Sequence, residues 1–157
     1  MSVEMLKQCA LFKDFTAVGL EILAKIAKPK IVLAGKPVFQ EGKPSESLFI
    51  LVEGRLSVLI KGPDGRETPM ASLGGGEHLG EMSLLAAARR PVHVCSVVAE
   101  ANSKLLEISA VDFQTLMKDK PQACMKLLLS LSADFGRKAV DAREPLSHVV
   151  ARSVVGR

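Results

Sequence analysis

The sequence predicts an antiparallel β-barrel or sandwich flanked by helices, and two observations support this prediction. Short apolar runs with β-strand character recur roughly every ten residues between Ile31 and Ile108, and glycine-rich turns separate them. One such turn, Pro63-Asp64-Gly65, has a clear mechanism, because Pro presets φ and Gly accepts a positive φ. Helical periodicity occurs at the two ends of the chain and in one short stretch inside the β region.

Each element follows from its local pattern. Residues 3–12 and 20–27 repeat apolar side chains at helical intervals, and Pro29 ends the second of these helices. After the strands, Ser109 is typical of a helix N-cap, and Pro121 suits the first turn of a longer helix. The strands are expected at residues 31–33, 38–39, 48–52, 56–60, 68–73, 92–98 and 104–108.

The composition is that of one globular domain. The chain has 157 residues, 48% of them hydrophobic, and a formal net charge of +4. We expect a domain over residues 1–143, which ends with the long helix, and a C-terminal tail over residues 144–157. Tyr and Trp are absent, so side chains that stack on nucleic-acid bases are scarce. Cys9, Cys95 and Cys124 form no C-x-x-C pair, so neither a disulfide framework nor a zinc site is expected.

The chain lacks the signals of several other protein classes. No apolar run approaches the roughly 20 residues that cross a bilayer, and the amino terminus carries charges where a signal peptide is apolar. A cytoplasmic protein is therefore expected. No nucleophile with an adjacent base, pair of carboxylates or metal-ligand cluster occurs at a usable spacing, so we expect no enzyme activity, no metal and no cofactor.

The helical interruption at residues 81–88 follows the run Leu79-Gly80-Glu81-Met82-Ser83 and precedes Arg90. A glycine that enters a short helix exposes backbone N–H groups, and an arginine supplies a planar cation, so together they predict a site for a small anion. The alternative interpretation is a salt bridge between Glu81 and Arg90 that holds the loop without a ligand.

Strand alternation favours Arg90 over its neighbour Arg89 as the cation of this site. In a strand over residues 92–98, Arg90 shares a face with Val92 and Val94, whereas Arg89 points away. The same alternation turns His93 away from that face, toward the exterior of the barrel.

Three segments in sequence order resemble the cyclic nucleotide-binding domain family, which includes the regulatory domain of cAMP-dependent kinase, cyclic-nucleotide-gated channels and catabolite activator proteins. They are residues 38–54 with glycines at the turns, residues 73–81, and the phosphate-binding cassette from Gly80 to Arg90 with Val94 and Ser96 beyond it. The similarity extends from about Leu6 to about Arg143. It implies an eight-stranded antiparallel jelly-roll barrel with N-terminal helices, a cassette helix and C-terminal helices, and a cyclic nucleotide bound against the cassette helix.

The resemblance also implies roles for the cassette residues. Glu81 is similar to the family's glutamate that accepts a hydrogen bond from the ribose 2′-hydroxyl, and Arg90 to the arginine that pairs with the cyclic phosphate. The backbone N–H groups of residues 81–83 are expected to face the phosphate. Pro91 and Val92 depart from the small residue and Ala that usually follow the arginine, which removes a phosphate contact and favours cAMP over cGMP. The implied ligand-binding residues are Leu79, Gly80, Glu81, Met82, Ser83, Arg90, Pro91 and Val92.

The expected function is regulatory. A cyclic nucleotide would reposition the terminal helices and so signal to an effector protein that the sequence does not identify. The alternative is a degenerate domain that acts as a protein interaction module without nucleotide, which Pro91 and Val92 motivate. The apolar face of the long helix is expected to pack on the domain, with a homodimer through this helix as the alternative. About fourteen residues follow Arg143, too few for a helix-turn-helix, so DNA binding is disfavoured.

Overall fold

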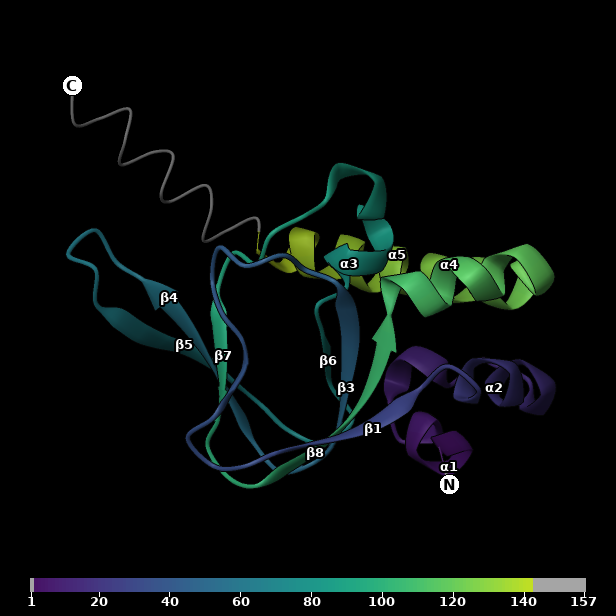
Figure 1. The fold of residues 1–157 in the computed structure, drawn as a ribbon, viewed down its shortest axis with the longest axis horizontal. Coiled ribbons are helices and arrows are strands. Elements are labelled where there is room, and N and C mark those ends of the chain that lie inside the picture. The colour runs from purple at the N-terminus through teal and green to yellow at the C-terminus, as the bar shows by residue number, and fades with distance from the viewer. Residues whose placement is uncertain (1, 143–157) are drawn as a thin grey trace.

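The computed structural model describes residues 2–142, which form two four-stranded antiparallel sheets with helices beside one of them (Figure 1). The first sheet has the strand order β1-β8-β3-β6 and the second β2-β7-β4-β5, so strands distant in sequence pair within each sheet. This arrangement confirms the predicted fold class. The strands are β1 (Lys28–Val32), β2 (Pro37–Phe39), β3 (Ser47–Glu53), β4 (Leu56–Lys61), β5 (Glu67–Leu73), β6 (His78–Leu79), β7 (Ser96–Ala99) and β8 (Ser103–Ser109).

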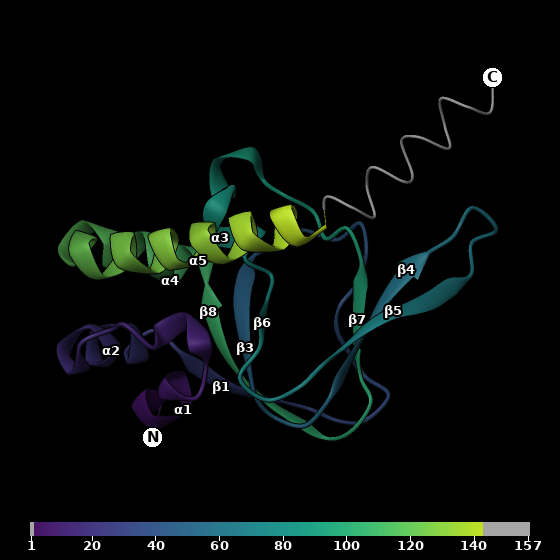
Figure 2. The same cartoon turned by 180° about the vertical axis from the view of Figure 1, so that it is seen from behind.

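The helices from both ends of the chain gather on the side of the first sheet, as the two opposite views show (Figures 1 and 2). The predicted N-cap at Ser109 is confirmed, because its Oγ accepts a hydrogen bond from the amide of Asp112 at 3.0 Å. The predicted domain end at residue 143 and the tail over residues 144–157 lie outside the described residues. The helices are α1 (Ser2–Lys7), η1 (Ala10–Phe12), α2 (Ala17–Ala24), α3 (Met82–Leu85), η2 (Ala87–Arg89), α4 (Ala110–Asp119) and α5 (Pro121–Asp141).

The central strand β3 divides the hydrophobic core in two. Successive side chains of a strand point to opposite faces, so Leu48 and Ile50 pack against the helices while Phe49 and Leu51 lie between the two sheets. Burial on both faces explains why the β3 sequence is a continuous apolar run rather than an alternating one. The buried residues of the helix-side cluster that come from the helices include Leu6, Leu20, Leu23, Phe113, Leu127 and Leu131.

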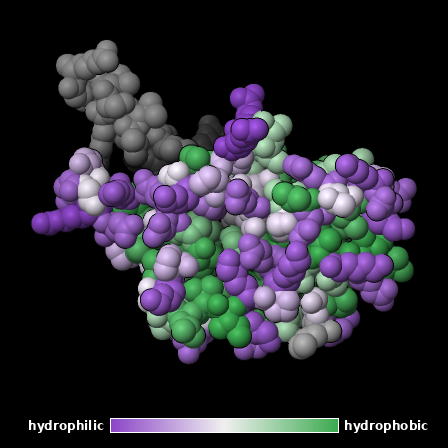
Figure 3. Space-filling view, in the orientation of Figure 1, coloured by the Kyte–Doolittle hydropathy of each residue, from purple (hydrophilic) through white to green (hydrophobic). Residues whose placement is uncertain are grey.

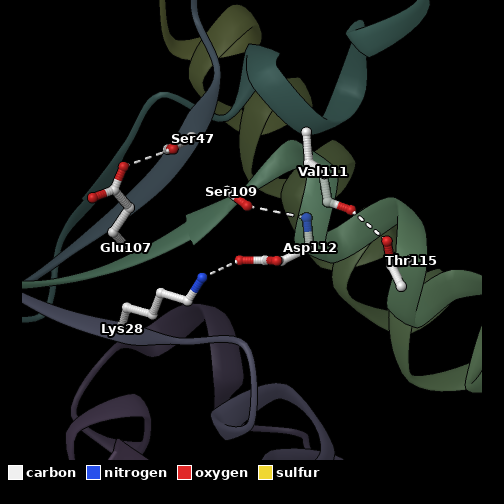
Figure 4. Close-up of polar contacts among 7 residues, drawn as sticks. All are labelled: Lys28, Ser47, Glu107, Ser109, Val111, Asp112 and Thr115. Atoms are coloured by element: carbon white, nitrogen blue, oxygen red, sulfur yellow. Dashed lines mark hydrogen bonds and ion pairs between the residues drawn. The ribbon is translucent and has the colours of Figure 1, made fainter.

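Polar contacts fix the start of α4 to the first sheet (Figure 4). Lys28 Nζ donates a hydrogen bond to Asp112 Oδ2 at 2.6 Å. Hydrogen bonds from Lys28 and from Ser109 lower the pKa of Asp112. On β8, Glu107 accepts a hydrogen bond from the Ser47 hydroxyl at 2.8 Å, which ties β8 to β3. The β8–α4 junction is therefore held by partnered polar groups as well as by the core.

One predicted strand is wrong in its first half. Instead of forming a strand from residue 92 onward, residues 91–95, here called the strap, run beside the loop of residues 42–45, and β7 begins at Ser96. Pro44 and Pro91 have no N–H group, so a continuous ladder cannot form, and an isolated bridge joins Pro44 to Val92. Three backbone hydrogen bonds of 2.8 Å hold the strap, from the amide of Ser45 to Pro91, from that of His93 to Lys43, and from that of Gly42 to His93.

The visible surface mixes hydrophilic side chains with apolar ones (Figure 3). In the part of the chain that the structure describes, no helix is long and apolar enough to cross a bilayer. Within residues 2–142, no group of three or more His, Cys, Asp or Glu side chains is placed to hold a metal ion. Candidate sites for small ligands therefore come from the cavities.

Candidate ligand-binding site

A cavity of about 190 Å³ lies between the two sheets, beside the junction of β6 and α3. The second sheet contributes apolar side chains, and the strap lines another side. Five of the residues that the sequence assigns to a ligand site meet here, namely Leu79, Gly80, Glu81, Met82 and Val92. The other residues of the wall are Phe39, Ser45, Val58, His78, His93, Val94, Cys95 and Val97.

Gly80 brings the β6–α3 junction against β3. Its φ is 81°, a left-handed conformation that favours glycine, and a Cβ atom at this position would collide with the carbonyl oxygen of Ser47. The absence of a side chain at Gly80 therefore lets the backbone approach strand β3 closely. This approach fixes where Glu81 and Met82 stand in the cavity wall.

Two backbone amides at the start of α3 have no backbone acceptor. Within residues 2–142, the amides of Glu81 and Met82 donate to no backbone carbonyl. The amide of Ser83 differs, because it donates to the Gly80 carbonyl at 3.1 Å, and the Ser83 hydroxyl donates to the same oxygen at 2.7 Å. The amide of Ser83 thus already has an acceptor within the protein, whereas the amides of Glu81 and Met82 have no backbone acceptor among the described residues.

The structure places Glu81 and Arg90 at different cavities. Glu81 is half-buried in the wall of the barrel cavity, and its side chain makes no capping hydrogen bond. Arg90 is exposed and lines a second cavity of about 760 Å³ beside the β8–α4 junction, together with Ser83 and Pro91. Among residues 2–142, the salt bridge between Glu81 and Arg90 does not form. Val92 borders both cavities.

The backbone of Arg90 is left-handed, with φ 48° and ψ 63°, directly after η2. This conformation costs roughly 1–2 kcal/mol for a residue with a Cβ atom. The alternation that favoured Arg90 over Arg89 assumed a strand, and the strap is not part of a sheet. Arg90 nevertheless shares the second cavity with Val92, whereas Arg89 lines neither cavity. The sequence signal against a strand was the proline pair Pro44 and Pro91.

His93 lines the barrel cavity, so its predicted outward orientation is wrong. Its ring stacks on the ring of Phe39, with centroids 3.7 Å apart and an interplanar angle of 4°. Its amide donates to Lys43 and its carbonyl accepts from Gly42, both at 2.8 Å. Partial burial lowers the pKa of His93. Sequence reasoning missed this residue because it treated the strap as a strand.

Ser45 forms part of the wall of both cavities. Its side chain is 6% exposed, and its Oγ has no hydrogen-bond partner among the described residues. An unpartnered buried hydroxyl is costly, roughly 1–3 kcal/mol, unless a ligand or water satisfies it. The hydroxyl is therefore a polar group that a bound ligand can use.

His78 connects the barrel cavity to α5. It lies on β6 in the cavity wall, and its Nε2 is 3.3 Å from Asp134 Oδ2, too poorly oriented for a hydrogen bond. Asp134 also pairs with Lys138 at 2.9 Å and Arg137 at 2.6 Å. Burial, and next the charge of Lys138, lower the pKa of His78. His78 therefore lies between the barrel cavity and Asp134 of this helix.

The two antiparallel four-stranded sheets place this chain in the class of jelly-roll barrel domains, and a small cavity lies between them. The sequence profile of the cyclic nucleotide-binding domain matches residues 29–120, more than half of the chain. The chain belongs to the cyclic nucleotide-binding domain family.

Several relatives cover most of this chain. A cyclic nucleotide-gated potassium channel from Rhizobium etli is 32% identical over 112 residues, which is 71% of this chain and 29% of the channel. A CRP-like cAMP-activated global transcriptional regulator from Mycobacterium tuberculosis is 24% identical over 154 residues, which is 98% of this chain and 66% of the regulator. The chain thus spans less than two thirds of either protein.

Solved structures agree on the fold. The catabolite activator protein of Thermus thermophilus superposes with a TM-score of 0.77 at 25% identity, over 89% of this chain and 62% of that one. The N-terminal domain of a transcriptional regulator from Streptomyces coelicolor superposes with a TM-score of 0.73 at 28% identity, over 88% of this chain and 96% of that one. Both likenesses support the jelly-roll assignment.

Proposed function

We propose that this domain binds a cyclic nucleotide in the barrel cavity, with cAMP favoured over cGMP, and acts in the cytoplasm as a regulatory domain rather than an enzyme. One observation carries the proposal: Glu81 and Met82 line one cavity, and their amides donate to no backbone carbonyl among residues 2–142. The carboxylate is suited to accept a hydrogen bond from a ribose 2′-hydroxyl, and the amides are suited to donate to phosphate oxygens. The apolar side chains of Phe39 and Val97 suit a base.

The size of the cavity supports a conformational response. At about 190 Å³ it is smaller than most small-molecule sites, which measure roughly 300–1,000 Å³, and this difference supports a movement of the wall when a nucleotide enters. The strap and α5 are the neighbours that can move, since His78 stands between the cavity and Asp134 of α5. A ligand that binds the opened arrangement more tightly shifts the helices toward it. We propose that this shift is the signal.

An apolar strip on α5 is the proposed surface for the receiving partner. Met125, Leu129, Phe135 and Val140 are between 49% and 71% exposed along this helix. The partner is either an effector protein or a second copy of the chain. Sedimentation with and without cAMP separates the two, because a homodimer through α5 would dissociate in the Leu129→Glu variant, whereas a monomer at all concentrations would favour an effector.

Titration calorimetry with cAMP, cGMP and 2′-deoxy-cAMP tests the proposed function. Glu81→Gln should weaken cAMP binding about tenfold and leave 2′-deoxy-cAMP binding unchanged, because the variant replaces the charged acceptor of the 2′-hydroxyl with a weaker, neutral amide oxygen. The matched control is Glu67→Gln, at an exposed position on β5, which should change neither affinity.

Heat from none of the three nucleotides at millimolar concentration would contradict the proposal. The interaction module without nucleotide would then be favoured, and the position of Arg90 outside the barrel cavity would be its structural basis.

A further inference from the structure

The two halves of α5 are attached to the rest of the protein in different ways. The first half contributes Cys124, Leu127 and Leu131 to the helix-side core. Over residues 132–141, here called the distal half, Asp134 is the one residue that is not exposed. Burial of apolar side chains is what normally holds a helix on its domain. The distal half therefore lacks the usual attachment.

A cavity of about 610 Å³ lies beside the distal half, between α5, η1 and the turn that joins β5 to β6. Ala133 and Lys138 line it from the helix, and Leu11 and Gly76 line it from the other two segments. Side chains that face an open space lack partner atoms on that side. A movement of the distal half away from these segments therefore breaks few van der Waals contacts.

One polar contact joins the distal half to another element. Among residues 2–142, the contact of 3.3 Å between His78 Nε2 on β6 and Asp134 Oδ2 is its one ion pair or hydrogen bond outside α5. The first half has a polar attachment of its own, since Lys126 Nζ donates to the carbonyl oxygen of Asp14. The position of the distal half therefore depends on a contact with a titratable ring.

A positive charge on His78 would have no counter-ion of its own. The His78 side chain is 9% exposed, and its Nε2 has no hydrogen-bond partner among the described residues. The carboxylate that it faces, Asp134, already pairs with Lys138 at 2.9 Å and Arg137 at 2.6 Å. A protonated His78 would be a third cation around this carboxylate. A buried charge without its own partner is costly.

The wider surroundings of His78 agree with this geometry. Burial, and next the charge of Lys138, lower the pKa of His78 and outweigh the nearby carboxylates. Burial raises the pKa of Cys9, so that thiol stays neutral in the acidic range. The titratable or charged groups in these surroundings are Asp134, Arg137 and Lys138 of α5, Glu77 and Glu81 on either side of β6, and Cys9, Lys13 and Asp14 of the N-terminal segment.

We propose that His78 and Asp134 form a pH-operated latch: the distal half of α5 is docked on β6 while His78 is neutral, and it is released when His78 takes up a proton. The described structure is the docked arrangement. The inference concerns the ligand-free protein and does not depend on nucleotide binding. Because the distal half carries Phe135 and Val140 of the apolar strip, acidity would control how that surface is presented.

The direction of the pH effect follows from linkage. In the docked arrangement the pKa of His78 lies below its usual value because of burial, and after release water surrounds the ring and its pKa returns to about 6.5. Release therefore takes up a proton. The docked arrangement has its full advantage above about pH 6.5 and loses it as the pH falls from there through the pKa of the docked state.

The partner of the latch does not titrate in this range. Burial raises the pKa of Asp134, but hydrogen bonds from Lys138 and Arg137 lower it by more, so the pKa lies below its usual value. Asp134 is thus ionised in both arrangements. A change between about pH 5.5 and 7.5 reports the ring and not the carboxylate.

The experiment is NMR of the ligand-free whole chain between about pH 5.5 and 7.5. The chain has three histidines, so the ring signals of His78 can be followed separately from the other two. The backbone order parameters of the distal half should fall from about 0.85 at the highest pH to below about 0.6 at the lowest, in step with the titration of His78. Residues 124–131, which the core holds, should keep theirs and serve as the internal reference.

Two substitutions at position 78 fix the charge. His78→Gln is neutral at every pH, so its distal half should stay ordered at pH 5.5. His78→Arg is charged at every pH, so its distal half should be released at both ends of the range. The matched control is His93→Gln, which removes another half-buried histidine and should keep the wild-type response of α5. Circular dichroism verifies folding, and His78→Phe is the second uncharged variant if His78→Gln does not fold.

Two results would overturn the proposal. If the distal half of the wild-type protein keeps or gains order at pH 5.5 while the His78 ring titrates, protonation does not release the helix. If the distal half loses order equally in the uncharged variants, another group is the trigger and His78 is not the latch. Neither result bears on cyclic-nucleotide binding, which calorimetry measures separately.

Discussion

The β8–α4 junction and the cassette region lie next to one another and differ in how their polar groups are satisfied. At the junction, Asp112 is partnered by Lys28 and by the Ser109 cap, and Glu107 is bonded to Ser47. In the cassette region, the Ser45 hydroxyl is buried and two amides lie without backbone acceptors, counting partners among residues 2–142, and Arg90 is left-handed. The first region is complete without a ligand. The second contains the groups that a ligand would satisfy, and the two regions should therefore respond differently to mutation.

The largest effect is expected in the core beneath the β8–α4 junction. Leu106→Ala should lower the free energy of unfolding by about 2–5 kcal/mol. The Leu106 side chain is fully buried on the face of β8 that packs against the helices, and its truncation leaves a cavity. Urea unfolding measures the change. Val94→Ala in the strap, 82% exposed, should shift the same quantity by less than about 0.5 kcal/mol. Equal losses at the two positions would contradict the contrast between the regions.

A glycine pair tests how tightly the cassette is held against β3. Gly80→Ala should lower the free energy of unfolding by about 2–4 kcal/mol, because a left-handed Ala is strained and its Cβ atom collides with the Ser47 carbonyl. Gly35→Ala is the matched control, with a similar φ of 79° and open space around the added carbon, so it should cost about 1 kcal/mol. Thermal and urea unfolding of both variants give the difference. If the two variants lose the same stability, the contact with β3 contributes nothing.

Removal of the Ser109 cap of α4, at the β8–α4 junction, should have a smaller effect on the free energy of unfolding. Ser109→Ala should lower the free energy of unfolding by about 1 kcal/mol, since the Asp112 amide loses its acceptor. Ser132→Ala on the exposed face of α5 should be neutral or slightly stabilising, because Ala is the better helix former. Cyclic-nucleotide affinity should change in neither variant. A loss of affinity in Ser109→Ala would show that the two regions are coupled.

The smallest effect concerns Asp134, which links α5 to His78. Burial alone would raise the pKa of Asp134, but hydrogen bonds from Lys138 and Arg137 outweigh it, so the pKa lies below its usual value. The stabilisation is present above the unfolded-state pKa and is lost as the pH falls through the folded-state pKa. Asp134→Asn should thus lower the free energy of unfolding by about 0.5 kcal/mol at neutral pH, and by less under strongly acidic conditions.

The control for Asp134→Asn is Glu100→Gln, at an exposed position. Its stability should follow that of the wild-type protein across the same pH series. If Asp134→Asn has the same acid sensitivity as the wild-type protein, the hydrogen bonds to Asp134 do not stabilise the fold.

The contrast between the regions also explains what the sequence could predict. The Ser109 cap was predictable because a helix N-cap depends on residues within one turn of each other. The Gly80-Glu81 junction was predictable because the glycine, the short helix and their order along the chain form a local pattern. Both features are set by neighbours in sequence.

The strap was not predictable in the same way. Its path depends on hydrogen bonds to residues 42–45, about fifty positions earlier, and on the two prolines that prevent a regular ladder. Alternation within residues 91–95 therefore gave His93 an outward orientation, whereas His93 lines the barrel cavity. The two-residue strand β6 was missed because it is too short to show a period and is defined by its pairing with β3.

The backbone hydrogen bonds of the strap have an evolutionary consequence. Because main-chain atoms at residues 91 and 93 hold its path, the side chain at position 93 can be exchanged without rerouting the segment. A lineage could therefore change the strap side chains that line the barrel cavity through single codon changes while the barrel stays intact. Selectivity in this domain can therefore diverge faster than its architecture.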